Sequence, residues 1–114
     1  MLAFAVGVAH SILGERYILV RLLRRSDLPH LLGSDWFTRR TLRFAWHLTS
    51  LAWFGFAALL LVLAREGAPD RALLLRAIGA TFVISAAITG GASRGRHLAW
   101  VVFLAIGVLT WVAA

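Results

Sequence analysis

The chain has 114 residues, of which 61% are hydrophobic, and its mean hydropathy is +0.82. This apolar share exceeds the roughly 45–50% of ordinary soluble domains, which disfavours a soluble bundle, and the absence of cysteine excludes disulfides, thiolate metal sites and cysteine nucleophiles. Twelve arginines oppose five acidic residues, giving a net charge of +7. Because these arginines flank apolar runs, they fit membrane anchoring, and no nucleic-acid partner is expected.

Four apolar runs predict four membrane-spanning helices, at about residues 2–23, 42–64, 72–91 and 97–114. Each run is near the roughly 20 residues that cross about 30 Å of hydrocarbon. Backbone groups in lipid must be satisfied within the segment, which favours helices. The predicted fold class is therefore all-α. It is a single domain, 1–114, that forms an integral membrane four-helix bundle running up-down-up-down.

The first run carries polar residues in the stretch HSILGER (10–16). The small residues Ala3, Gly7 and Ser11 recur every four positions and lead to Glu15, a spacing that allows close helix packing in lipid. His10 and Glu15 are five residues apart, which places them about 140° apart around a regular α-helix. They would therefore need a helix distortion to face one ligand.

The first connection, RRSDLPHLLGSDWFTRRT (24–41), is interrupted by Pro29. Ser34 is expected to cap a short helix that begins near Asp35, because serine is a preferred N-cap residue. Trp36 is typical of a membrane interface. This segment is therefore predicted to be an interfacial loop that precedes the second spanning helix.

The other two connections are shorter. REGAPDR (65–71) reads as a turn in which Asp70 starts the third helix. GGASRGR (90–96) reads as a glycine-rich hairpin whose backbone N–H groups could cradle a phosphate. Because it lacks the spacing of a Walker motif, a lipid headgroup is favoured over a nucleotide.

Charge predicts the orientation of the chain. Eight arginines flank the first and third connections: Arg21, Arg24, Arg25, Arg39, Arg40, Arg43, Arg94 and Arg96. Only three flank the second connection: Arg65, Arg71 and Arg76. Basic residues in short loops favour the cytoplasmic side. The first and third connections are therefore predicted to be cytoplasmic, with both termini periplasmic.

Depth along the helices predicts a polar cluster in the cytoplasmic half. At 1.5 Å per residue, Glu15 and His47 each lie roughly 7–8 Å inside the cytoplasmic ends, Ser85 about 9 Å and His10 about 15 Å. Polar groups at such depths face the protein interior. The expected cluster comprises His10, Glu15, Arg43, His47, Ser50 and Ser85.

Three interpretations of the chain stay open, and the first is favoured. It is a small membrane subunit or scaffold that acts through a partner, as a homodimer or in a larger complex, with the cluster serving as a structural pair. Its arginines would contact the bilayer through anionic lipid headgroups. The candidate headgroup residues are Arg24, Arg25, Arg39, Arg40, Arg94 and Arg96.

The second interpretation is a metal- or haem-binding protein. His10, His47 and His97 come from three predicted helices, and imidazole suits zinc, copper and iron. The expected cofactor would be haem or a transition metal, although no HxxxH or ExxH pair is present.

The third interpretation is proton-coupled transport. Four helices and one acidic residue in the first helix resemble the small multidrug resistance exporters in outline. That resemblance implies that Glu15 would bind a proton and a cationic substrate in turn. Arg16, the next residue in the chain, would instead hold Glu15 ionised and repel cations.

The segments HSILGER, LRFAWHLTS and RHLAWVVF resemble those of small uncharacterised four-helix proteins of the bacterial inner membrane. The resemblance covers most of the chain; it implies location and architecture but no activity. The sequence contains no nucleophile triad, Walker motif, dinucleotide fingerprint or carboxylate pair, so an enzyme is not favoured.

Overall fold

The structure, a computed structural model, describes residues 1–114 and consists of helices joined by loops, without strands. The first helical rod is continuous from Leu2 to Leu22, but a π-helical segment interrupts its α-helical geometry. Three further helices come after it. In chain order the elements are α1 (Leu2–Leu13), π-helix η1 (Gly14–Leu19), α2 (Val20–Leu22), α3 (Trp36–Leu63), α4 (Arg71–Ser93) and α5 (Ala99–Val112).

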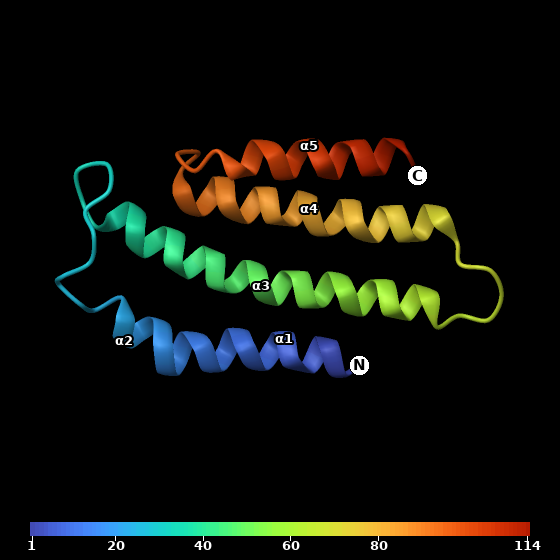
Figure 1. The fold of residues 1–114 in the computed structure, drawn as a ribbon, viewed down its shortest axis with the longest axis horizontal. Helices are drawn as coiled ribbons and strands as arrows, with labels where there is room; N and C mark the ends of the chain where they lie inside the picture. Colours follow the sequence, from blue (N-terminus) through green and yellow to red (C-terminus); the bar gives the residue numbers. More distant parts are fainter.

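The four rods lie side by side in chain order and form a flat row (Figure 1). The α1 helix packs only on α3, α3 on α4, and α4 on α5. The principal extents are 55 × 29 × 14 Å, so the row is one helix deep, since a helix with its side chains is about 10–12 Å across. The expected four helices are present, but they make an open row and not a closed bundle, because α1 does not contact α4 or α5.

Chain direction reverses at each connection, so both termini lie at one end of the row together with the α3–α4 connection (Figure 1). The α2–α3 and α4–α5 connections lie at the opposite end. The eight arginines of these two regions are therefore gathered at a single end of the molecule.

Three of the rods are long and apolar enough to cross a membrane: Leu2–Leu22, Trp36–Leu63 and Arg71–Ser93, with 21, 28 and 23 residues. The α5 helix is also apolar, but its 14 residues extend only about 21 Å, less than the roughly 30 Å of a bilayer core. Only 14 of the 114 residues are buried, and the exposed residues include large apolar side chains on every rod. By length and composition, these features suggest a membrane protein.

The α3 helix begins six residues earlier than the sequence predicts, at Trp36 and not near residue 42. The expected short helix at Asp35 is therefore the first turn of the spanning helix, and Ser34 does not cap it. Asp35 occupies the N-cap, and its carboxylate binds Arg39 four residues later, 2.6 Å away. Such a pair stabilises a first helical turn, which explains why the helix extends to polar residues that precede the apolar run.

The start of α4 matches the expectation from the sequence. Asp70 is the N-cap residue, and its side chain accepts hydrogen bonds from the amides of Ala72 and Leu73 at 2.9 and 3.2 Å. These bonds satisfy two of the free N–H groups at the helix start. A carboxylate cap therefore fixes where the chain re-enters helical structure.

Glycines set the closest approaches between the rods. A Cβ atom at Gly7 would lie 2.7 Å from the Phe54 ring, so α1 meets α3 closely there. Added Cβ atoms at Gly79 and Gly107 would each lie 3.1 Å from the carbonyl oxygen of the other glycine. The α4–α5 contact is thus a backbone-to-backbone approach that small residues permit in lipid.

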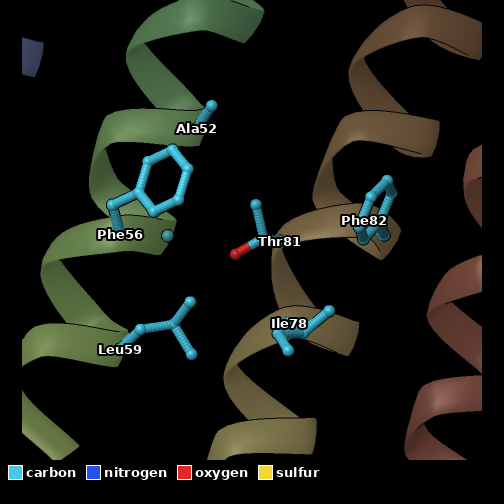
Figure 2. Close-up of a pocket in the computed structure, with 7 residues that line it drawn as sticks. Ala52, Phe56, Leu59, Ile78, Thr81 and Phe82 are labelled. Carbon is cyan, nitrogen blue, oxygen red and sulfur yellow. The ribbon is translucent and has the colours of Figure 1, made fainter. Parts of the chain in front are cut away.

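A groove of about 240 Å³ lies between α3 and α4. Figure 2 shows Phe56 and Leu59 of α3 facing Ile78 and Thr81 of α4 across it. The Thr81 hydroxyl donates a 2.8 Å hydrogen bond to the carbonyl of Ala77 in its own helix. The groove therefore presents an almost entirely apolar surface, in which the proton of the Thr81 hydroxyl is already donated.

Candidate functional site

A polar cluster lies between the first rod and α3. We define the α1–α3 polar cluster as a set of six side chains linked by hydrogen bonds or ion pairs: His10, Ser11, Glu15, Arg43, His47 and Ser50. Three come from the first rod and three from α3. On α3 they recur at intervals of four and three residues, which places them on one helix face.

The π-helix η1 begins at Gly14, one residue before Glu15. It supplies the distortion that a regular α-helix would need if His10 and Glu15 are both to meet α3. A π-segment accommodates an additional residue in one turn, so it rotates the residues on its C-terminal side relative to those before it. With this rotation, both side chains contact residues of the neighbouring helix.

Hydrogen bonds connect the cluster from one end to the other. Glu15 forms an ion pair with Arg43 at 3.0 Å and lies 3.3 Å from Nε2 of His47. The Nδ1 atom of His47 lies 2.9 Å from the Ser11 hydroxyl. That hydroxyl is 2.8 Å from Ser50 Oγ, which lies 3.0 Å from His10 Nδ1. The contacts of the α1–α3 polar cluster are therefore connected without a break from Arg43 to His10.

Two proton arrangements satisfy the section between the histidines. In the first, His10 donates to Ser50, the two hydroxyls donate onward to Nδ1 of His47, and Nε2–H of His47 donates to Glu15. In the second, both hydroxyl groups donate in the opposite direction, from Ser11 to Ser50 and from Ser50 to Nδ1 of His10. His47 then donates from both ring nitrogens and carries a positive charge, because neutral imidazole has only one N–H. Exchange between these arrangements moves one proton from His10 to His47 through Ser11 and Ser50. His10 is therefore the doubly protonated, positively charged ring in the first arrangement, and it keeps only its Nε2–H in the second.

Trp46 fixes the position of His10. The two rings stack with centroids 4.5 Å apart and planes 9° apart, and the indole N–H donates to the His10 carbonyl at 3.1 Å. The indole lies directly against Gly14, where any added Cβ would overlap it. Gly14 therefore serves two purposes: it admits the indole and it begins the π-helix.

The cluster is unevenly covered. Ser50 is 1% exposed, whereas the side chains of Glu15, His47 and Arg43 are 35%, 34% and 48% exposed. Thr49, which lies beside His10, is also exposed. Because the row is one helix deep, no other part of this chain covers that side of the cluster.

Five of the six cluster residues expected from the sequence are joined in this chain, and Ser85 is not. Its hydroxyl donates to the carbonyl of Thr81 in α4, and α4 does not contact the first rod. Sequence reasoning missed Ser11 as a hydrogen-bonding member and Trp46 as the residue that orients His10. The signal for Ser11 was its position one turn before Glu15 in the small-residue stripe.

The structure does not bring the three candidate metal-binding histidines into one set. His97 packs against the rings of Phe37 and Phe44, with centroids 6.1 and 5.4 Å away, and its Nδ1 accepts from the Ala99 amide. No group of three or more histidine, aspartate or glutamate side chains is placed to hold a metal ion. His10, His47 and His97 therefore do not form the expected three-histidine ligand set.

The candidate headgroup arginines fall into two groups. Arg25 and Arg39 bind Asp27 and Asp35, at 2.5 and 2.6 Å. The hydrogen bond from Arg25 lowers the pKa of Asp27 to about 2, and that from Arg39 lowers the pKa of Asp35. Arg24, Arg40, Arg94 and Arg96 form no ion pair with an acidic residue.

The glycine-rich hairpin does not offer the backbone N–H cradle that its composition suggested. The amides of residues 94–97 all donate within the chain: to the carbonyls of Gly91, Gly90 and Ser93 and to the Ser93 hydroxyl. Any anion bound there must therefore be held by side chains.

Comparison with protein-family models, with curated proteins and with solved structures gives no match to this chain. The likeness to small inner-membrane proteins thus gains no support from them, and the functional argument stands on the geometry described above.

Proposed function

We propose that this chain is a multi-pass protein of the bacterial inner membrane that acts as a subunit or scaffold, through a partner or a second copy. One observation carries the proposal. The row is one helix deep and leaves the α1–α3 polar cluster half-exposed on its surface. Half-exposed ionisable groups are costly in hydrocarbon, so another protein surface is needed to cover them.

Membrane insertion is supported by the exposed apolar surface. In water, large contiguous apolar surfaces drive association or aggregation, whereas in lipid they match the solvent. Three rods have the length to span, and α5 packs along α4 through the paired glycines. We propose that α5 also crosses, with local thinning of the bilayer accommodating its shorter length.

The proposed orientation places the arginine-rich end in the cytoplasm and both termini in the periplasm. It is supported by eight arginines at the end that holds the α2–α3 and α4–α5 connections, against three near the other. A periplasm-active reporter fused to the C-terminus should be active, and a cytoplasm-active one silent. The reverse pattern would reject this orientation.

The association proposal is tested by a photo-crosslinking residue placed at Thr49, on the uncovered side of His10. In native membranes we expect one discrete crosslinked product, either of twice the chain mass or with a single partner. The matched control is the same residue at Val102, which is 58% exposed on α5, far from the cluster in the row. Equal crosslinking from the two positions, or none from Thr49, would contradict the proposal.

A second candidate, proton-coupled transport, is favoured by the continuous hydrogen-bond chain. Chains of acidic residues and histidines inside membranes are typical of proton relays. Proteoliposomes containing the wild-type chain should then dissipate an imposed pH gradient faster than empty liposomes. Glu15→Gln should abolish the difference, while Ser85→Ala, outside the chain, should retain it. A wild-type rate equal to that of empty liposomes would exclude this candidate.

A further inference from the structure

Three arginine side chains converge on a single indole at the arginine-rich end. The guanidinium carbons of Arg40, Arg94 and Arg96 lie 5.6, 5.1 and 5.5 Å from the ring centroid of Trp36. We define these four residues as the Trp36 cage. Trp36 and Arg40 belong to the first turns of α3, whereas Arg94 and Arg96 belong to the α4–α5 hairpin, so the cage joins segments distant in the sequence.

The hairpin is fixed in place, so the cage is preorganised. His97 packs against Phe37 and Phe44 of α3. The amide of Gly95 donates to the Gly90 carbonyl at 2.8 Å, and Trp100 Nε1 donates to the Gly95 carbonyl at 3.2 Å. These contacts hold the two hairpin arginines beside α3 without help from a ligand.

The charge of the cage is not neutralised within the chain. The three acidic residues at this end, Glu15, Asp27 and Asp35, are each bound by a different arginine. None of these partners belongs to the cage. Cation–π contacts with Trp36 offset only part of the repulsion among three guanidinium groups, since each contributes modestly at an exposed position. An anion is the partner that would complete the site.

Phosphate is the anion that best fits this chemistry. Guanidinium groups bind phosphate oxygens in a planar, bidentate manner, and they do so better than lysine. A pocket of about 250 Å³ opens beside the cage, lined by Trp36, Arg40 and three further residues, Leu23, Arg39 and Arg43. Of the cage residues, Trp36 and Arg40 line this pocket, so it gives an anion access to that part of the cage.

We propose that the Trp36 cage binds the phosphate group of an anionic phospholipid. This rests on the proposed membrane insertion, which places tryptophan and arginine of a spanning helix at headgroup level. The same chemistry would accept free phosphate. The lipid is favoured because the cage lies at the first turns of a helix that is long and apolar enough to span.

The experiment compares lipid binding by the full chain in nanodiscs of phosphatidylcholine alone or with a minor fraction of phosphatidylglycerol. Bound lipid is measured by native mass spectrometry after release. The cage variant carries Arg40→Gln, Arg94→Gln and Arg96→Gln. The control variant carries Arg65→Gln, Arg71→Gln and Arg76→Gln, which remove the same charge from exposed positions away from the cage.

We expect the wild-type chain to retain phosphatidylglycerol over phosphatidylcholine. The cage variant should bind it on the order of 100-fold more weakly, since each arginine near a surface contributes about fivefold. The control variant should lose less than the cage variant, because its three arginines do not surround a common ring. Equal loss in both variants would show an effect of net charge alone and would overturn the proposal, as would undiminished binding by the cage variant.

Two further measurements distinguish a failure of the cage proposal from a failure of the proposed membrane insertion. Inorganic phosphate added to the chain in detergent should leave lipid retention unchanged; displacement of phosphatidylglycerol at a matched phosphate concentration would overturn the lipid assignment. Carbonate extraction of phosphatidylcholine vesicles tests insertion itself. Release of the chain from them would overturn the proposed membrane function, whereas retention without lipid preference would overturn only the cage.

Discussion

The Nε2 atom of His47 lies 3.3 Å from a carboxylate oxygen of Glu15, and this contact joins α3 to the π-helical segment of the first rod. Arg43 binds the other oxygen of the same carboxylate at 3.0 Å. Glu15 therefore terminates a hydrogen-bond chain on one side and an ion pair on the other. Replacement of His47 by alanine therefore breaks the connection between Glu15 and the Ser11 hydroxyl.

His47→Ala should lower the free energy of unfolding by about 0.5–2 kcal/mol, the range for interhelical hydrogen bonds in membranes and partly buried sites. Reversible unfolding in mixed detergent micelles, followed by helicity, measures it. The matched control is Ser85→Ala, which removes a hydroxyl bonded within its own helix and should change stability by less than about 0.5 kcal/mol.

The energetic coupling between hydrogen-bonded residues of the α1–α3 polar cluster is a more specific test than the loss of stability in one variant. Ser11→Ala and His47→Ala should not be additive when combined, because the two side chains share a 2.9 Å hydrogen bond. Simple additivity of the two changes would mean that the cluster is a set of independent contacts.

The sequence predicts the pairing of Glu15 with His47 because that inference needs only the rise per residue and the end of the membrane that each helix reaches. The same reasoning fails for Ser85. Depth does not determine which helices are neighbours, and in a flat row α4 is separated from the first rod by α3. The start of α3 was missed because the predicted helix began with the apolar run near residue 42, whereas the Asp35–Arg39 pair lies in the first helical turn.

The π-helix could not be predicted from local sequence. Gly14 is compatible with an ordinary helix, and the distortion is accompanied by a tertiary contact, the Trp46 indole that lies on it and binds the His10 carbonyl. The sequence did carry one sign of it. His10 and Glu15 were both expected to face the interior, yet a regular helix places them on different faces.

Gly14→Ala should destabilise the chain by about 1–3 kcal/mol, because the added methyl group overlaps the Trp46 indole and the closely packed site must shift. Near-ultraviolet circular dichroism should report the displaced indole. Gly91→Ala is the matched control: nothing lies within 4 Å of an added Cβ there, so the helix should gain about 0.5–1 kcal/mol. Equal stability of the two variants would contradict the packing of Trp46 on Gly14.

Gly107→Ala should loosen α5 from α4. The new Cβ would lie 3.0 Å from the backbone nitrogen of Val83 and 3.1 Å from the Gly79 carbonyl, and backbone atoms cannot move aside as a flexible side chain can. Amide hydrogen exchange in α5 should increase, with a loss of about 1–3 kcal/mol. Gly90→Ala is the control, since its Cβ would make only ordinary contact with Trp100 at 3.5 Å. Unchanged exchange in the Gly107 variant would refute the close approach.

Asp27 should titrate far below an ordinary aspartate. Its hydrogen bond with Arg25 lowers its pKa from 3.8 to about 2, so the pair stabilises the folded chain fully above the ordinary value. That contribution decreases as the pH falls from about 4 to about 2, because Asp27 is protonated at a lower pH in the folded chain than in the unfolded chain. Carboxyl chemical shifts across this range measure the midpoint. Arg25→Gln should return it to about 3.9, and high salt should raise it in the wild-type chain because the pair is exposed. A wild-type midpoint near 3.9 at low salt would show that Arg25 does not hold Asp27.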